Sequence, residues 1–243
     1  MGGTPAMLAA MRTRGWRRLR SAKLAILYAM QDQAGPNSVE YMDRLHLPFP
    51  VWRDGRREQA RPMAEARKVR FPGGRQATVH RIDTPEQATL PLVLGAESAT
   101  TGIAFDDPAA TALLASMVKL GLWRAISGPA FTGLRRSLLH QPGAGAPHEL
   151  VLDLDGEDAA GQPQTLRLGL RDPLGQTHLT ALGAVLQLER VLGADGRPAP
   201  RPGVCYPESD PSDAWVEAAW EAEGIQLTGQ GAQAPGAGEL LAR

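Results

Sequence analysis

The feature that most constrains the fold is a pair of segments in which leucine occupies every second position. Side chains alternate between the two faces of a β-strand, so a period of two predicts a strand with one buried face. A polar loop, Asp155 to Gln164, joins the two segments, and the pair is expected to run antiparallel. The leucines are Leu150, Leu152 and Leu154 in the first segment and Leu166, Leu168 and Leu170 in the second.

Glycine and proline mark two hairpins earlier in the chain. Asp54-Gly55 is the dipeptide preferred in a type I′ turn, and it separates residues 51–53 from 56–58. Pro72-Gly73-Gly74 separates a second pair of expected strands, at 68–71 and 77–82. A compact apolar run, Ala22–Met30, predicts a further, buried strand.

The clearest predicted helix follows Asp106 and Asp107, which are expected to cap it, with Pro108 at its start. Its expected buried stripe consists of Leu113, Leu114, Met117 and Leu120, before Gly121 ends the helix. Other helices are predicted after Thr4 (as N-cap) and Pro5, from Asn37-Ser38 through Leu45, from Thr177 to Gly193, and from Asp210 to Gly224. A short strand over 225–227 comes last.

These elements predict a mixed α/β (α+β-like) fold, in which an antiparallel-rich sheet is flanked by helices. The length of 243 residues and the 43% hydrophobic content are typical of a globular protein. We expect one domain over residues 1–227 and a flexible tail over 228–243, where Gly, Gln, Ala and Pro dominate.

Charge is balanced overall but divided along the chain. The first 75 residues carry 15 basic and 6 acidic side chains, whereas the remaining 168 carry 11 and 20. The two halves either attract each other across an internal or subunit interface, or carry scattered solvated charge. The arginines between Arg12 and Arg20 are expected on a solvated helix face. Neither nucleic acid nor a membrane is an expected partner, and a cytoplasmic location is expected, since no targeting segment is recognisable.

Several classes of chemistry find no motif. The single cysteine, Cys205, excludes an internal disulfide and a thiolate metal cage. No G-x-G-x-x-G follows a strand, and neither a phosphate-binding loop nor a serine nucleophile elbow is present. The acidic residues between Asp153 and Asp158 are poorly spaced for a calcium loop, because Gly156 falls too early.

Two groups of polar residues remain as candidates. His80, Asp83 and Glu86 lie at the end of an expected strand and in the loop after it, and a histidine beside carboxylates can transfer protons near neutral pH. Alternatively, His80 faces solvent and Glu86 caps a helix or turn. Tyr206 and Glu208 form either an interaction edge or the punctuation before the last helix.

The order of these pieces resembles the part of the saccharopine dehydrogenase-like oxidoreductases that follows their N-terminal Rossmann domain. The likeness spans roughly residues 2–227 and is carried by five stretches in the family's order. They are Gly3-Thr4-Pro5 with Leu8, Pro50 to Arg56 (PVWRDGR), Val69 to Gly74 (VRFPGG), Thr84 to Pro91 (TPEQATLP, a loop in the family), and Gly203 to Glu208 (GVCYPE) followed by Trp215 to Ile225.

The resemblance implies a substrate-binding and dimerisation portion of an oxidoreductase that transfers hydride at a C–N bond of an amino-acid-type substrate. It implies NAD or NADP as cofactor, but no motif in this chain would bind it, so a Rossmann-domain partner chain or a missing upstream segment is expected, with homodimer formation. By resemblance His80 and Glu86 are candidate catalytic residues near the cleft. Arg53 is the candidate for binding a carboxylate, with Tyr206 and Glu208 at the domain junction. The alternative is a non-catalytic binding or dimerisation module.

Overall fold

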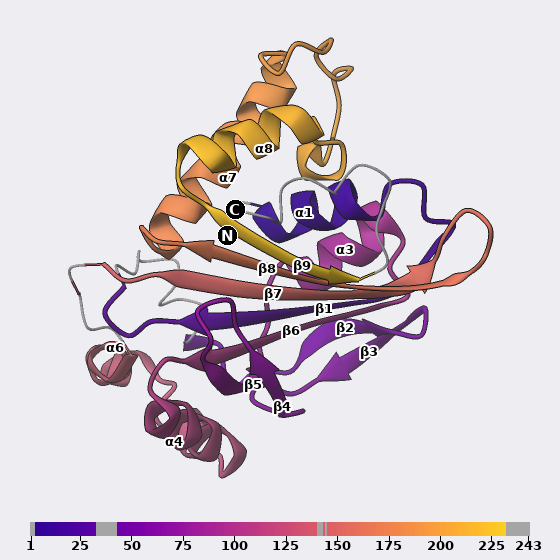
Figure 1. Ribbon diagram of the computed structural model, residues 1–243. Helices are drawn as coiled ribbons and strands as arrows, with labels where there is room; N and C mark the ends of the chain where they lie inside the picture. The colour runs from indigo at the N-terminus through magenta and orange to yellow at the C-terminus, as the bar shows by residue number, and fades with distance from the viewer. Residues whose placement is uncertain (1–2, 33–42, 140–142, 144, 232–243) are drawn as a thin grey trace.

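The computed structural model describes residues 3–32, 43–139, 143 and 145–231, built around a seven-stranded sheet (Figure 1). Its strand order is β4-β5-β6-β1-β7-β8-β9. Within the described residues β1 runs parallel to β6, and the other neighbouring strands pair antiparallel. Helices flank this curled, mostly antiparallel sheet, which confirms the predicted fold class.

The elements have the following bounds. The strands are β1 (Arg18–Tyr28), β2 (Phe49–Arg53), β3 (Arg56–Ala60), β4 (Arg67–Arg70), β5 (Gln76–Arg81), β6 (Ser98–Phe105), β7 (His148–Glu157), β8 (Pro163–Asp172) and β9 (Gln226–Gly231). The α-helices are α1 (Thr4–Arg12), α3 (Glu86–Leu94), α4 (Pro108–Lys119), α5 (Leu122–Ala125), α6 (Thr132–Leu139), α7 (Gln176–Leu192) and α8 (Asp213–Ala222). Two 3-10 turns are η1 (Pro129–Phe131) and η2 (Pro207–Ser209).

The two leucine-rich segments pair as predicted. Opposite positions of β7 and β8 are Leu150 with Leu170, Leu152 with Leu168, and Leu154 with Leu166. The strands run further into the expected loop than predicted, since Glu157 still pairs with Pro163. The buried face of this hairpin therefore follows directly from the period of two in the sequence.

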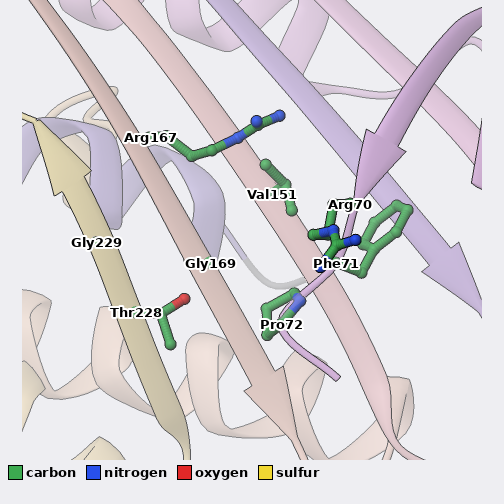
Figure 2. Close-up of a pocket in the computed structure, with 8 residues that line it drawn as sticks. All are labelled: Arg70, Phe71, Pro72, Val151, Arg167, Gly169, Thr228 and Gly229. Atoms are coloured by element: carbon green, nitrogen blue, oxygen red, sulfur yellow. The ribbon is translucent and has the colours of Figure 1, made fainter. Parts of the chain in front are cut away.

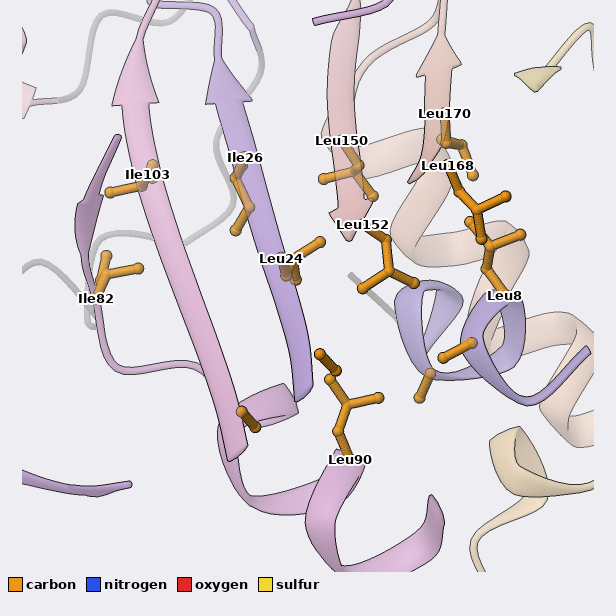
Figure 3. Close-up of a cluster of buried hydrophobic side chains, with 14 of the residues drawn as sticks. Leu8, Leu24, Ile26, Ile82, Leu90, Ile103, Leu150, Leu152, Leu168 and Leu170 are labelled. Carbon is orange, nitrogen blue, oxygen red and sulfur yellow. The ribbon is translucent and has the colours of Figure 1, made fainter. Parts of the chain in front are cut away.

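Alternation along the central strand β1 divides the core between the two faces of the sheet. Leu24 and Ile26 join the main cluster, whereas Ala25 and Leu27 join a smaller cluster on the opposite face. Figure 3 shows the main cluster, in which strand side chains meet Leu8. In Figure 1, α1, α3, α7 and α8 cover one face of the sheet. The β2–β3 hairpin lies on the other side, and the sheet curls so that its end strands β4 and β5 also fold over that side.

Both predicted hairpins are confirmed. Asp54 and Gly55 have φ values of 50° and 74°, as a type I′ turn requires at its two central residues, and they join β2 to β3. The second hairpin pairs β4 with β5, and its turn carries the Pro72-Gly73-Gly74 sequence.

The predicted stripe of α4 is wrong in part. Asp107 caps the helix, because its side chain accepts a hydrogen bond from the Ala109 N–H, and Leu114 is buried as expected. Leu113 and Leu120, in contrast, are 60% and 75% exposed. The buried face instead uses Thr111 and Ala115, which are small enough to let the helix approach β6 closely.

Two predictions near the N-terminus need correction, and a third is mostly untested. Gly3, with φ 74°, is the N-cap of α1, and Thr4 is buried with its hydroxyl donating to the Leu179 carbonyl at 3.5 Å. Arg18 and Arg20 lie on β1, so the arginine-rich segment does not form one helix face. The helix expected from Asn37-Ser38 lies mostly outside the described residues.

Two more differences concern later segments. The expected loop at 84–91 contains most of helix α3, which tolerates Pro91 in its interior. The expected strand at 225–227 is β9, which pairs with β8 as far as Gly231, so residues 228–231 belong to the sheet and not to a tail. Residues 232–243 lie outside the described part of the chain.

The divided charge of the chain is matched within the fold. Basic residues of the first 75 positions form ion pairs with acidic residues of the remainder. Four of these pairs have N–O distances of 2.5–2.9 Å: Arg12–Glu217, Arg14–Asp213, Arg18–Glu97 and Arg67–Asp153. Arg20 pairs in the same way with Glu157. These pairs are partly exposed, so each contributes about 0–1 kcal/mol to stability. In these pairs, the two halves of the chain therefore attract each other within one molecule, as one of the two interpretations of the charge division predicts.

A search of the described residues for a helix long and apolar enough to cross a membrane finds none.

His178, in the first turn of α7, links the end of β8 to the end of α8. Its Nδ1 lies 2.8 Å from Asp172 Oδ2, and its Nε2 lies 3.3 Å from Glu223 Oε2. Burial opposes the charged ring, but the hydrogen bonds and charges of Asp172 and Glu223 outweigh that effect and raise the pKa of His178.

Because the pKa of His178 is raised on folding, its stabilising effect is complete below the unfolded value of about 6.5 and is lost as pH rises through the folded pKa. We expect the difference in unfolding free energy between the native protein and His178→Gln to shrink as pH rises from about 6 to 9. Urea unfolding at several pH values measures it. A difference that stays constant or grows over this range would contradict the linkage.

Candidate functional site

The candidate site is a hollow of about 340 Å³ on the face of the sheet opposite the main helices. Its floor is formed by β7, β8 and β9, and the turn that follows β4 forms one wall (Figure 2). The lining residues are Arg70, Phe71, Pro72, Val151, Arg167, Gly169, Thr228 and Gly229.

The floor is low because Gly169 has no side chain. A Cβ at this position would overlap the Thr228 hydroxyl and would lie 2.8 Å from Cγ of Pro72. Val151, beside Gly169 in the β7–β8 register, belongs to the smaller hydrophobic cluster with Phe71. Val151 thus gives the floor an apolar part beside the polar side chains of Arg167 and Thr228, and Gly169 allows Pro72 to approach the strand.

The wall is held in place by a hydrogen bond from the β4–β5 turn to β7. The Gly73 N–H donates to Glu149 Oε2 at 2.7 Å. A Cβ on Gly73 would overlap the other carboxylate oxygen, so a larger residue here would require the Glu149 side chain to move. Through this hydrogen bond, Gly73 of the VRFPGG motif holds Arg70 and Phe71 beside the sheet.

Positive charge gathers around the hollow. Asp153 accepts from Arg67 Nη1 at 2.6 Å and pairs with Arg167 Nε at 2.9 Å, so one carboxylate serves two guanidinium groups. Arg70 is exposed, and no ion pair or side-chain hydrogen bond is found for it within the described residues. Figure 2 shows the side chains of Arg70 and Arg167 near Val151, with Thr228 beside Gly169.

This arrangement can bind an anion but offers no proton-transfer group. A guanidinium fork pairs bidentately with a carboxylate, and the Thr228 hydroxyl is a further hydrogen-bonding group. Val151, Phe71 and Pro72 provide apolar surface for a carbon chain. None of the eight lining residues is a histidine, carboxylate or cysteine.

His80 lies away from the hollow. It pairs with Ile103 of the main core and is 8% exposed, and the Lys119 charge that acts on it comes from the end of α4. Burial, followed by the Lys119 charge, lowers the pKa of His80, although a hydrogen bond with the Met63 backbone opposes this. Its Nδ1 is buried without a partner. His80 is therefore a buried, largely neutral imidazole at pH 7.

Glu86 and Arg53 also lie outside the hollow. Glu86 begins α3 and is 4% exposed, and within the described residues no hydrogen bond or ion pair joins it to His80. Arg53, at the end of β2, lies 2.7 Å from Glu65 Oε1. Glu65 also pairs with the buried Arg81, and these two arginines outweigh burial and lower the pKa of Glu65. Arg53 thus already pairs with a carboxylate of its own chain.

Tyr206 and Glu208 lie on the helical side of the sheet. Tyr206, the residue before η2, is 43% exposed. Its carbonyl accepts a hydrogen bond from the hydroxyl of Ser209, the last residue of η2. Glu208 is 9% exposed and packs beside the start of α1, because a Cβ placed on Gly3 would lie 3.2 Å from the Cβ of Glu208. None of the five residues predicted from the sequence lines the hollow.

The residues that line the hollow were not among the candidate site residues named from the sequence. Arg70 lies inside a motif that was recognised for its turn, and Arg167 occupies an outward position of the alternating strand β8. Thr228 falls in the segment expected to be a tail. The available signal was the outward position of Arg167, which places a charge on the face opposite the leucines.

The parallel strand β6 is not followed by a dinucleotide-binding turn, and the described residues hold no cluster of metal ligands. A dinucleotide phosphate needs a glycine-rich turn between a parallel strand and a helix N-terminus. Within the described residues the parallel strand β6 is followed by Asp106 and Asp107, which would repel a phosphate at the start of α4. The described residues also contain no group of three or more His, Cys, Asp or Glu side chains placed to hold a metal.

Comparison with known proteins identifies a structural likeness. No protein-family model matches the chain, and no curated protein matches it by sequence. Among solved structures, apo histidine-tagged saccharopine dehydrogenase (L-Glu forming) from Saccharomyces cerevisiae aligns with a TM-score of 0.56 and 15% identity, over 94% of this chain and 71% of that one. At this identity the likeness shows a shared fold, and it confirms the structural resemblance expected from the sequence motifs.

Replacing Gly169 with alanine tests the geometry of the floor. We expect Gly169→Ala to lower the free energy of unfolding by about 1–3 kcal/mol, because the new methyl group overlaps Thr228 and crowds Pro72. Urea unfolding measures the change. Gly229→Ala is the matched control on the next strand, where a Cβ would lie 3.5 Å from Cδ2 of Leu168, an ordinary contact. Equal losses in the two variants would show that the predicted crowding at Gly169 is absent.

Proposed function

We propose that this chain supplies the substrate-binding surface of a saccharopine dehydrogenase-like oxidoreductase, with the sheet-face hollow holding a carboxylate of an amino-acid-type substrate. The observation that carries the proposal is Arg70, an exposed guanidinium at the edge of the hollow, for which no ion pair or side-chain hydrogen bond is found within the described residues. Its fork matches a carboxylate bidentately. The likeness to saccharopine dehydrogenase supports an oxidoreductase-like domain.

In this proposal Arg167 and Thr228 have secondary roles. Asp153 holds Arg167 in position through its Nε and also pairs with Arg67. Because two guanidinium groups share one carboxylate, Arg67, Asp153 and Arg167 together keep a net positive charge beside the substrate. Thr228 offers its hydroxyl to a second polar group of the substrate. His80 and Glu86 lie outside the hollow, and catalytic roles for them stay predictions.

The nucleotide is proposed to come from a Rossmann-bearing partner chain that supplies NAD or NADP. When bound, such a cofactor supplies the hydride chemistry, and the present chain contributes binding and orientation of the substrate. Homodimer formation also stays a prediction. A non-catalytic module with the same fold would keep the sheet but would not need an exposed arginine at position 70.

Isothermal titration calorimetry with L-saccharopine, and separately with L-glutamate, tests the binding role. We expect saturable binding of at least one of them to the native chain, weakened about tenfold or more in Arg70→Gln through loss of a charged pair. Arg201→Gln removes an exposed arginine from the loop between α7 and η2, so it is the matched control and should bind as the native chain does. Equal affinity in Arg70→Gln and the native chain, or binding of neither compound, would overturn the proposal.

A further inference from the structure

The helices α4, α5 and α6, together with η1, form a lobe at the β5–β6 end of the sheet, called here the 108–139 lobe. In Figure 1 it projects at the opposite end of the molecule from α7 and α8. Its surface is unusually apolar for a projecting part of a protein. Large hydrophobic side chains exposed on it are Leu113 (60%), Leu120 (75%), Leu122 (52%), Phe131 (43%) and Leu134 (48%).

The charge on this lobe has one sign. From Pro108 to His148 the sequence contains Lys119, Arg124, Arg135 and Arg136 but no aspartate or glutamate. Lys119 and Arg124 are exposed. Three acids lie at the base of the lobe: Asp107 caps α4, Asp106 accepts from the Met30 N–H at 2.9 Å, and Asp43 pairs with Arg135. On the lobe itself the exposed leucines are therefore accompanied by two exposed basic side chains, Lys119 and Arg124.

The lobe presents these leucines on a fixed frame. Arg135 is 4% exposed, and its guanidinium donates to the carbonyls of Ile126 and Gly128 and to Asp43. Trp123, 1% exposed, anchors α5 in the main core. The apolar side chains are thus exposed in a folded, internally braced lobe, and their exposure is a property of the native surface.

We propose that the 108–139 lobe docks on an anionic lipid surface, with Leu113, Leu120 and Leu122 entering the acyl boundary. Apolar side chains combined with Lys and Arg are the composition of segments that lie in a membrane interface, where buried apolar area and attraction to acidic headgroups add. A projecting lobe suits a flat bilayer better than a groove-shaped partner does.

Charge argues against a second copy as the occupant. A two-fold contact brings the same patch of both chains together, so Lys119 and Arg124 of each copy would be brought close to the same two basic side chains of the other. An anionic lipid surface instead supplies negative charge to these side chains. A partner protein with an acidic apolar surface remains a different proposal, and the experiment below separates it from the lipid.

Co-sedimentation with vesicles provides the test. We expect the native chain to sediment with phosphatidylcholine vesicles that contain about 30% phosphatidylglycerol, and to be released at about 0.5 M salt because the headgroup attraction is screened. The double variant Leu120→Asp/Leu122→Asp should lose about tenfold in bound fraction, since both positions must enter the apolar boundary. Both side chains are exposed in the native fold, so circular dichroism should show unchanged folding.

A variant on the far side of the molecule serves as the matched control. Leu188→Asp changes an equally large side chain on α7 that is 56% exposed, and it should sediment with the vesicles as the native chain does. The proposal is overturned if the native chain stays in the supernatant, or if the lobe variant and the α7 variant bind alike. It is also overturned if light scattering shows self-association that only the lobe variant abolishes, without vesicle binding. None of these outcomes depends on Arg70, so they leave the proposed substrate site untouched.

Discussion

The pairing of β1 with two strands of opposite direction organises the whole molecule. β1 runs parallel to β6 and antiparallel to β7, which makes it the strand on which both halves of the sheet depend. Ala22 and Ala25 are fully buried, and such small side chains allow layers on both faces to approach closely. The alternation of β1 then sends Leu24 to the helical side and Leu27 to the other side. Two unequal layers result, and the thinner one carries the candidate site.

The hollow exists because the thinner layer covers only part of its face. The β4–β5 hairpin crosses onto β7 and β8, where the Gly73 N–H meets Glu149 and Pro72 meets the space left by Gly169. Beyond that contact the face is open toward β9, and Arg70 lies at its edge with no carboxylate paired to it within the described residues. The shape of the hollow is thus a consequence of two glycines at which the hairpin approaches the sheet closely.

Local sequence patterns predicted the elements that obey a single simple rule. The period of two gave β7 and β8, and Asp54-Gly55 gave the first hairpin. Strand β6 was missed because Gly102 and its threonines break the apolar run, although its position between β5 and β1 buries it. Helix α3 was missed because Pro91 normally ends a helix, whereas packing of Leu90 in the main core overrides that preference. The hollow was not predicted for a different reason: it joins strands distant in sequence, whereas His80 and Glu86 are neighbours in sequence and lie outside it.

The central claim is that the open face of the sheet binds an amino-acid carboxylate at Arg70. Two-dimensional amide NMR of the ¹⁵N-labelled full chain, titrated with L-saccharopine, tests it most directly. The account predicts that the amide signals that shift belong to the turn after β4 and to β8 and β9, including those of Gly169 and Gly229, with the helical side unchanged. Shifts confined to the surroundings of His80, Tyr206 or Glu208, or no shifts at saturating ligand, would contradict it.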